Sequence, residues 1–212
     1  MRIQVITILG GALLCAAPQA WSIPGGSLDE DGSSAPKITA SAQDAVVYSD
    51  ALVLMKKGDA LGARPDAHDA YASARAKLQS LVARSPQFAE AWNSLGYTQR
   101  KLGAYDDALA SYAKALDLKP GYPEALEYRG EAYLRLNRIH DAKQAYLDLF
   151  ASNRKIAATL LEAMKVWLKA PPGAHAADPS EVSDLQQWVQ ERSQIAAQTA
   201  ALSREGAAAS WR

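Results

Sequence analysis

Cysteine is nearly absent from this sequence, and neither sign of charge is in excess. The only cysteine is Cys15, and the 23 basic residues (Lys and Arg) balance the 23 acidic residues (Asp and Glu). A lone cysteine excludes a disulfide within the chain. The even charge argues against a nucleic-acid-binding surface, which needs a basic excess, and it gives no sign of attraction to an anionic membrane surface.

Motifs that carry catalysis or bind cofactors are also missing. No Gly-x-Ser-x-Gly motif occurs, and no strand pattern precedes Gly25-Gly26 in the leader, so a phosphate-binding loop is not indicated. His68, His140 and His175 lie in or beside expected turns and lack metal-ligand spacing. We therefore expect no enzyme activity, no cofactor and no metal site, and the remaining class of function is binding.

The first 22 residues have the layout of a secretory signal peptide. Arg2 is followed by an apolar run of 15 residues, from Ile3 to Ala17, and then by small residues. This run is shorter than the ~20 residues that a membrane-spanning helix needs. Cleavage after Ala20 or after Ser22 fits the preference for small side chains. An uncleaved anchor in the inner membrane is the alternative.

Removal of residues 1–22 leaves a chain without cysteine, and hence without a thiolate nucleophile or a Cys-based metal site. Lipidation of Cys15 is disfavoured, because a small residue usually precedes a lipidated cysteine and Leu14 is large. We expect an exported protein of a bacterium that works in the periplasm.

Composition divides the rest of the chain into four segments. Residues 23–41 are rich in Gly, Ser, Pro and acids and predict a disordered leader. Residues 42–170 consist of helix formers without strand-like alternation. Residues 171–179 read as a linker, and residues 180–204 as a last helix, with Asp178 as its cap. The apolar stripe of that helix is Val182, Leu185, Trp188, Val189, Ile195, Ala196, Thr199 and Leu202.

A period of 34 residues runs through the helical region, and this is the length of a helix–turn–helix unit. Gly96 and Gly130 lie one period apart inside expected helices, where glycine costs about 1 kcal/mol relative to alanine. They therefore predict a close crossing of two helix backbones. Further sets with this spacing are Pro86 and Pro120; Ala74, Ala108 and Ala142; Leu78, Tyr112 and Tyr146; and Leu81, Ala115 and Leu149.

The central unit resembles the tetratricopeptide repeat. Gln99 departs from the usual Tyr, and in the next unit Arg129 replaces the usual Leu and Arg154 replaces a closing Pro. The resemblance covers about 42–170. It implies an all-α, right-handed superhelical stack of hairpins, with the last helix capping the open end. The matching residues are Trp92, Leu95, Gly96, Ala108, Tyr112, Ala115 and Pro120.

The units implied by the resemblance are 42–86, 89–120, 123–154 and a partial unit at 155–170. The first unit contains an insertion. If Gly58 is aligned with Gly103 and Tyr71 with Tyr105, about 11 extra residues remain at 59–69. We expect helices over about 44–57 and 70–84, with the insertion either forming a loop between them or extending one of them.

Repeat stacks bind partners on a concave surface that the first helix of each unit lines. Tyr97 and Tyr128 are the strongest candidates, because aromatic side chains with a polar tip are favoured in recognition surfaces. The long charged side chains also fit ordinary solvated helix faces. The full predicted set is Asn93, Tyr97, Arg100, Lys101, Glu127, Tyr128, Glu131, Arg135, Glu162, Lys165 and Lys169.

The resemblance implies a non-enzymatic protein-interaction module or scaffold that binds a partner peptide or helix. Some family members hold a partner's C-terminal carboxylate with Lys, Arg and Asn. Here Glu90, Glu124 and Glu127 share the predicted face, so a peptide with basic residues and an aromatic or apolar anchor fits better. The alternatives are an accessory subunit of an envelope assembly or secretion complex that acts by oligomerisation, and a small-ligand carrier.

Overall fold

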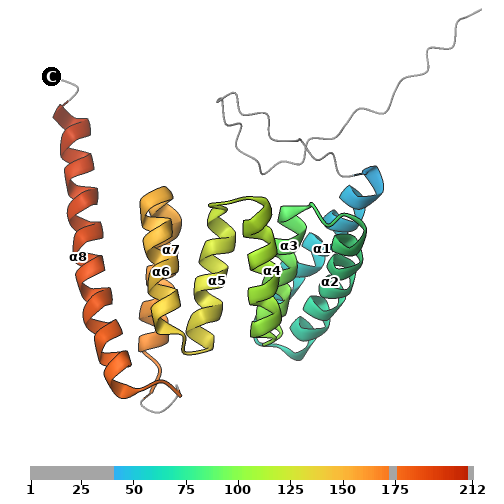
Figure 1. The fold of residues 1–212 in the computed structure, drawn as a ribbon, viewed down its shortest axis with the longest axis horizontal. Coiled ribbons are helices and arrows are strands. Elements are labelled where there is room, and N and C mark those ends of the chain that lie inside the picture. Colours follow the sequence, from blue (N-terminus) through green and yellow to red (C-terminus); the bar gives the residue numbers. More distant parts are fainter. Residues whose placement is uncertain (1–40, 172–175, 210–212) are drawn as a thin grey trace, which may run out of the picture.

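The structure is a computed structural model in which residues 41–171 and 176–209 are described, with side chains up to residue 199. This part of the chain consists of α-helices that pack as antiparallel hairpins in a row (Figure 1), and it contains no strand, which confirms the predicted all-α class. Residues 1–40 and 172–175, which include the predicted signal peptide, most of the leader and part of the linker, lie outside the described residues. The helices are α1 (Ala42–Leu61), α2 (Pro65–Arg84), α3 (Ala89–Lys101), α4 (Tyr105–Leu118), α5 (Pro123–Arg135), α6 (Ile139–Ser152), α7 (Arg154–Leu168) and α8 (Pro179–Ala209).

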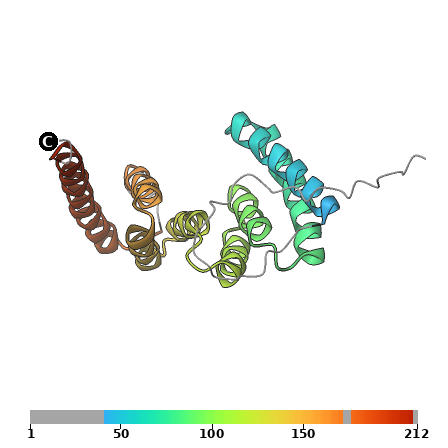
Figure 2. The ribbon, with the colours of Figure 1, turned by 90° about the horizontal axis from the view of Figure 1, so that it is seen from above.

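The residues that recur every 34 positions form the interior of the hairpins. The second helix of each hairpin carries a small residue, then a large residue and then a third residue, and all three are fully or almost fully buried. Seen from above, the hairpins follow one another along the stack in chain order (Figure 2). Burial of a large apolar side chain stabilises a fold by roughly 1.5–3 kcal/mol, so these positions hold each unit together. They are Ala74, Leu78 and Leu81 on α2, Ala108, Tyr112 and Ala115 on α4, and Ala142, Tyr146 and Leu149 on α6.

The helical glycines make room for side chains of a neighbouring helix. A Cβ atom added to Gly96 would lie 2.6 Å from Cε1 of Tyr112, and one added to Gly130 would lie 2.6 Å from Cδ2 of Leu160. The sequence predicts instead a close crossing of two helix backbones at these positions. The structure differs because an aromatic ring or a leucine side chain fills the space that the missing side chain leaves.

The insertion in the first unit lengthens both of its helices. α1 and α2 have 20 residues each, compared with 13 in α3 and 14 in α4. The turn between them is short, because Gly62 adopts the left-handed conformation (φ +62°) and Pro65 opens α2. The predicted alignment of Gly58 with Gly103 is therefore wrong. Gly58 lies inside α1, and Gly62 is the counterpart of Gly103 (φ +80°).

Two departures from the repeat signature have a structural reason. Gln99, which replaces the usual Tyr, is buried on α3, and its side-chain amide is 2.6 Å from Oγ of Ser111 on α4. Arg154 begins α7 directly after Asn153, which ends α6 and whose side chain accepts a hydrogen bond from the Ile156 N–H (3.1 Å). This asparagine cap makes a closing proline unnecessary.

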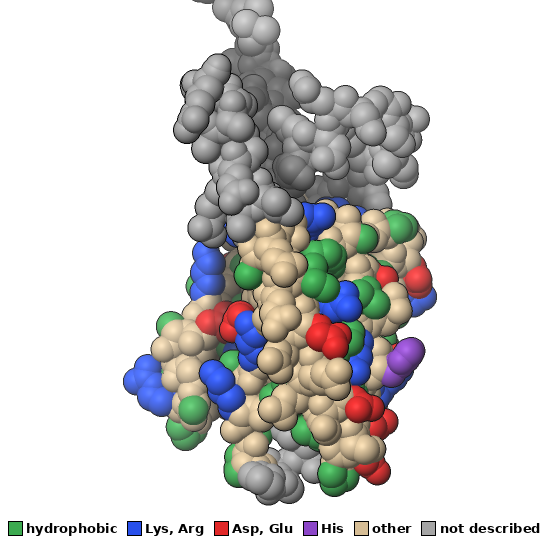
Figure 3. Space-filling view, turned by 90° about the vertical axis from the view of Figure 1, so that its left-hand side faces the viewer, with side chains coloured by type: hydrophobic (Ala, Val, Ile, Leu, Met, Phe, Trp, Pro, Cys, Tyr) green, Lys and Arg blue, Asp and Glu red, His purple; other side chains and the backbone are tan. Residues whose placement is uncertain are grey.

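The last helix covers the end of the stack. Asp178 Oδ1 accepts a hydrogen bond from the Ser180 N–H (2.7 Å), and α8 runs from Pro179 to Ala209, beyond the predicted end at 204. In its first half, Leu185 and Val189 are buried in the core formed with α5, α6 and α7. The face seen at this end mixes hydrophobic, basic and acidic side chains (Figure 3).

The packing at Gly96 predicts that Gly96→Ala destabilises the protein. Alanine is the better helix former by about 1 kcal/mol, but its methyl group collides with the fully buried Tyr112 ring, and such overpacking costs ~1–3 kcal/mol. Urea denaturation measures the free energy of unfolding. Gly130→Ala is the matched control with a smaller expected loss, because the ends of the Leu160 side chain can shift. A more stable Gly96→Ala variant would contradict this account.

Candidate functional site

The first helices of successive units lie next to one another along the stack, since α1 contacts α3, α3 contacts α5, and α5 contacts α7. We call the surface of α1, α3 and α5 the groove, and it surrounds a cavity whose lining includes Leu52, Asn93 and Tyr128. The groove combines apolar and polar groups: a layer of tyrosines and cations covers one part of it, and leucine, methionine, acidic and amide side chains line the other.

Three tyrosines and two cations form what we call the tyrosine–cation cluster: Tyr71, Tyr97, Tyr128, Arg100 and Lys101. The Tyr97 ring centroid lies 6.4 Å from that of Tyr71 and 5.1 Å from that of Tyr128. The Arg100 guanidinium is 5.2 Å from the Tyr97 centroid and 5.3 Å from the Tyr128 centroid. The Lys101 ammonium is 5.3 Å from the Tyr71 centroid and 5.7 Å from the Tyr97 centroid. Cations at such distances are attracted to the ring faces.

Asp59 ties this cluster to α1. Its Oδ1 accepts hydrogen bonds from the hydroxyls of Tyr71 and Tyr97, each at 2.5 Å, and lies 3.4 Å from Nζ of Lys101. Burial alone raises the pKa of Asp59, but the two tyrosine hydroxyls and Lys101 outweigh it and hold that pKa below its ordinary value. The carboxylate therefore stays charged at neutral pH, and it joins residues of α1, α2 and α3.

Arg100 is joined to α5 by an ion pair with Glu131. Only 12% of the Arg100 side chain is exposed, and a charge this buried is costly unless it is paired. Burial raises the pKa of Tyr128 to about 12, with a further contribution from Glu127, while Arg100 opposes the rise. The tyrosines of the cluster are therefore neutral hydrogen-bonding groups at physiological pH, and the cations carry its charge.

A cavity of about 250 Å³ opens between α1, α3 and α5, beside the cluster. Asn93 is 6% exposed, and its Oδ1 has no hydrogen-bond partner among the described residues. An unpaired buried acceptor costs roughly 1–3 kcal/mol, so a hydrogen-bond donor supplied to the Asn93 Oδ1 would be stabilising. The lining residues are Leu52, Met55, Lys56, Asp59, Asn93, Ser94, Tyr97, Glu124 and Tyr128.

Glu127 lies on α5 with Glu124 and Glu131 and is 8% exposed. No ion pair to it is found among the described residues. Burial, together with the carboxylates of Glu131 and Glu124, raises the pKa of Glu127 to about 7, although Arg100 opposes the rise. A carboxyl group with this pKa changes charge near neutral pH.

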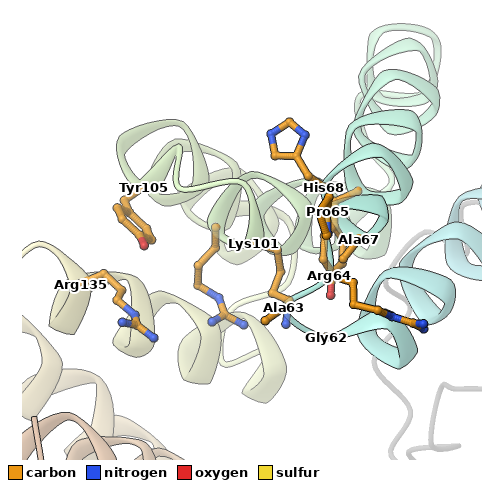
Figure 4. Close-up of a pocket in the computed structure, with 11 residues that line it drawn as sticks. Gly62, Ala63, Arg64, Pro65, Ala67, His68, Lys101, Tyr105 and Arg135 are labelled. Atoms are coloured by element: carbon orange, nitrogen blue, oxygen red, sulfur yellow. The ribbon is translucent and has the colours of Figure 1, made fainter.

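A second, larger cavity of about 530 Å³ lies where the turns of the first two units meet α5. Arg135 from α5 and Tyr105 from α4 lie on one side of it, and the first turn of α2 lies on the other (Figure 4). Its lining contains Lys101 and Arg135 but no acid. It shares Arg100, Lys101 and Tyr71 with the cluster, so cavities of different charge flank the cluster.

The structure brings together most of the predicted site residues. Asn93, Tyr97 and Tyr128 line the smaller cavity, and Arg135 lines the larger one. By contrast, Lys165 pairs with Glu162 on α7 at 2.7 Å, and neither residue lines either cavity. The other predicted residues are placed as follows: Arg100, Lys101 and Glu131 lie in or against the cluster, Glu127 lies on α5 beside Glu124, and Lys169 ends α7.

Sequence reasoning missed Asp59 and Tyr71, which hold the cluster in place, and also Leu52 and Met55. Asp59 fell inside the presumed insertion, and Tyr71 was aligned with a residue at the start of a second helix. The sequence nevertheless contains a helical spacing that indicates three of these residues. If α1 is continued to Leu61, then Leu52, Met55 and Asp59 follow one another at intervals of three and four residues and therefore share one face.

Comparisons with known proteins agree with the fold. Two family models, each described as a tetratricopeptide repeat, match residues 66–123 and 99–164. Residues 66–164 therefore match tetratricopeptide repeats. Among solved structures, the first TPR domain of Spaghetti (RPAP3), bound to the HSP90 peptide SRMEEVD, is similar. The match covers 56% of this chain and 94% of that chain, at 20% identity and a TM-score of 0.42. A comparison with curated proteins finds no match.

Within the described ranges, 41–171 and 176–209, no group of three or more His, Cys, Asp or Glu side chains is arranged to hold a metal ion. In the same ranges, none of the helices combines the length and the apolar character that a membrane span requires.

The buried Glu127 predicts a pH-dependent gain of stability in Glu127→Gln. The carboxyl binds its proton more tightly in the folded chain, so the folded state loses stability as the pH rises from about 4.5 to about 7. Glutamine does not ionise, so the Glu127→Gln variant does not lose stability in this pH range. We expect the variant to gain on the order of 2 kcal/mol relative to the original protein between pH 5 and pH 8, measured by urea denaturation.

Asp117→Asn is the matched control for this prediction, because Asp117 is exposed on α4. Its effect on the free energy of unfolding should be small and nearly the same at both pH values. A difference between Glu127→Gln and the original protein that does not change with pH would contradict the assignment of a raised pKa to Glu127.

Proposed function

We propose that this protein is a non-enzymatic protein-interaction module that holds a peptide segment or helix of a partner in the groove of α1, α3 and α5. The observation that carries the proposal is a preformed recognition surface. Five side chains of the tyrosine–cation cluster are fixed by one another, by Asp59 and by Glu131. Next to them, Asn93 has a buried acceptor that no described residue satisfies.

A preformed surface loses little side-chain conformational entropy when a partner binds. Binding usually requires long side chains to give up rotamer freedom, at about 0.5–1.5 kcal/mol for each. In the cluster, the tyrosines and Arg100 are already held by hydrogen bonds, the ion pair and ring contacts. Tyrosine and arginine are also the side chains that dominate interface energies. A partner that covers this surface therefore gains contacts at little conformational cost.

We further propose that the protein works in the bacterial cell envelope, as a periplasmic protein released by cleavage of residues 1–22. The support is the sequence pattern of a basic residue, a short apolar run and small residues. N-terminal sequencing of the protein from fractionated cells tests the proposal. We expect a soluble chain that begins at Trp21 or Ile23. A chain in the membrane fraction that retains residues 1–20 would support the anchored alternative.

A peptide selection tests the groove directly. The full chain is immobilised and a random peptide library on phage is selected against it, after which the enriched peptides are synthesised and their Kd is measured by fluorescence anisotropy. We expect Tyr128→Ala to weaken binding at least tenfold, because this ring lines the cavity and contacts Tyr97.

The control is Tyr133→Ala. Tyr133 is also partly buried on α5, but it packs against the core around α6 and α7 and lines neither cavity. Circular dichroism checks that both variants fold. Equal effects of the two variants on Kd would contradict the proposal of a peptide-binding groove. A library that yields no specific peptide would also contradict it.

A further inference from the structure

The cavity between α1, α3 and α5 presents hydrogen-bond acceptors that lack donors. Asn93 lines the cavity and its side chain is buried. Its Oδ1 has no hydrogen-bond partner among the described residues. It needs an N–H or O–H donor, and a ligand in the cavity is positioned to supply one.

Carboxylates on α5 reinforce this acceptor. Glu124 lines the same cavity and is only partly exposed, and Glu127 is buried on the same helix. In the described part of the chain, neither has an ion pair with Lys, Arg or His. The remaining acid of the lining, Asp59, is already engaged by Tyr71, Tyr97 and Lys101. The acceptors of the lining that lack a described partner, Asn93 Oδ1 and the Glu124 carboxylate, thus come from two helices, α3 and α5.

The other walls suit a cation on a flexible stem. Tyr97 and Tyr128 line the cavity with ring centroids 5.1 Å apart, and both rings already attract the guanidinium of Arg100. Leu52 and Met55 provide apolar surface for methylene groups. The volume of about 250 Å³ is below the roughly 300–1,000 Å³ of sites for drug-sized ligands, so it matches one long side chain.

We infer that this cavity is a cation site that takes the ammonium or guanidinium group of a lysine or arginine side chain from the docked peptide. The inference rests on the proposed function, and it names the chemistry by which the groove recognises its partner. The ligand cation donates to the Asn93 Oδ1 and pairs with the Glu124 carboxylate, and its methylenes lie against Leu52 and Met55.

One lining residue opposes a bound cation. Lys56 is exposed at the rim of the cavity and has no ion pair in the described structure. Its charge repels a basic side chain, but its exposure leaves it free to move into solvent. Lys56→Gln is therefore expected to strengthen the binding of a lysine-containing peptide by about twofold to fivefold, because one screened surface charge contributes little.

The test uses the peptides selected from the random library against the full chain. We expect a lysine or arginine at a fixed position in these peptides. Replacing it by norleucine, which keeps the methylenes and removes the charge, should raise Kd by roughly tenfold to a hundredfold. In the Glu124→Gln and Asn93→Leu variants, replacing the basic residue of the peptide by norleucine should change Kd much less. The reason is that each variant has lost a group that binds the cation, either the carboxylate or the amide oxygen.

Asp117→Asn provides the matched control, since it removes one negative charge from the exposed face of α4 and should leave the norleucine effect unchanged. Peptides that depend on Tyr128 but tolerate norleucine, or that select acidic residues without a basic one, would overturn the cation site and leave the proposed function standing. A failure to select any peptide would instead remove the proposed function and this inference with it.

Discussion

The fold depends on one kind of packing contact, in which a side chain of a neighbouring helix fills the space beside a helical glycine: Tyr71 at Gly58, Tyr112 at Gly96 and Leu160 at Gly130. Helices of 13 or 14 residues are marginal in water by themselves, so each must bury one face against a partner. In the central unit the Tyr112 ring takes the place of a side chain at Gly96, and Ala108 and Ala115 let the helices lie close together. In the first two units this contact joins the two helices of one hairpin, and at Gly130 it joins α5 to α7 of the next unit, so all these contacts lie between elements close in sequence.

The groove follows from that arrangement. Once α1, α3 and α5 are held in order, a carboxylate near the end of α1 reaches tyrosines on α2 and α3, and an arginine on α3 reaches a glutamate on α5. These polar links tie helices of three units together at the surface where the apolar core ends. They also leave an uneven distribution of charge, with free acceptors around the smaller cavity and cations around the larger one.

The repeat, the all-α class and most of the groove residues could be predicted from the sequence, because a 34-residue period fixes which positions face inward. The lengths of the two helices in the first unit could not be predicted in this way. The glycine at 58 resembles a turn residue, yet it lies within α1, where the Tyr71 ring occupies the space that a side chain would need. The lengths of α1 and α2 therefore escaped prediction, and with them Asp59, whose role depends on that extra length.

The most direct test of the account is a crystal structure of the full chain with a library-selected peptide. The account predicts a peptide that crosses α1, α3 and α5 beside the tyrosine–cation cluster. The nitrogen of its basic side chain should lie within hydrogen-bond distance, roughly 2.7–3.2 Å, of the Asn93 Oδ1, and it should pair with Glu124. A peptide seated on the second helices or along α8, with the smaller cavity vacant, would contradict the central claim that the groove is the binding surface of this protein.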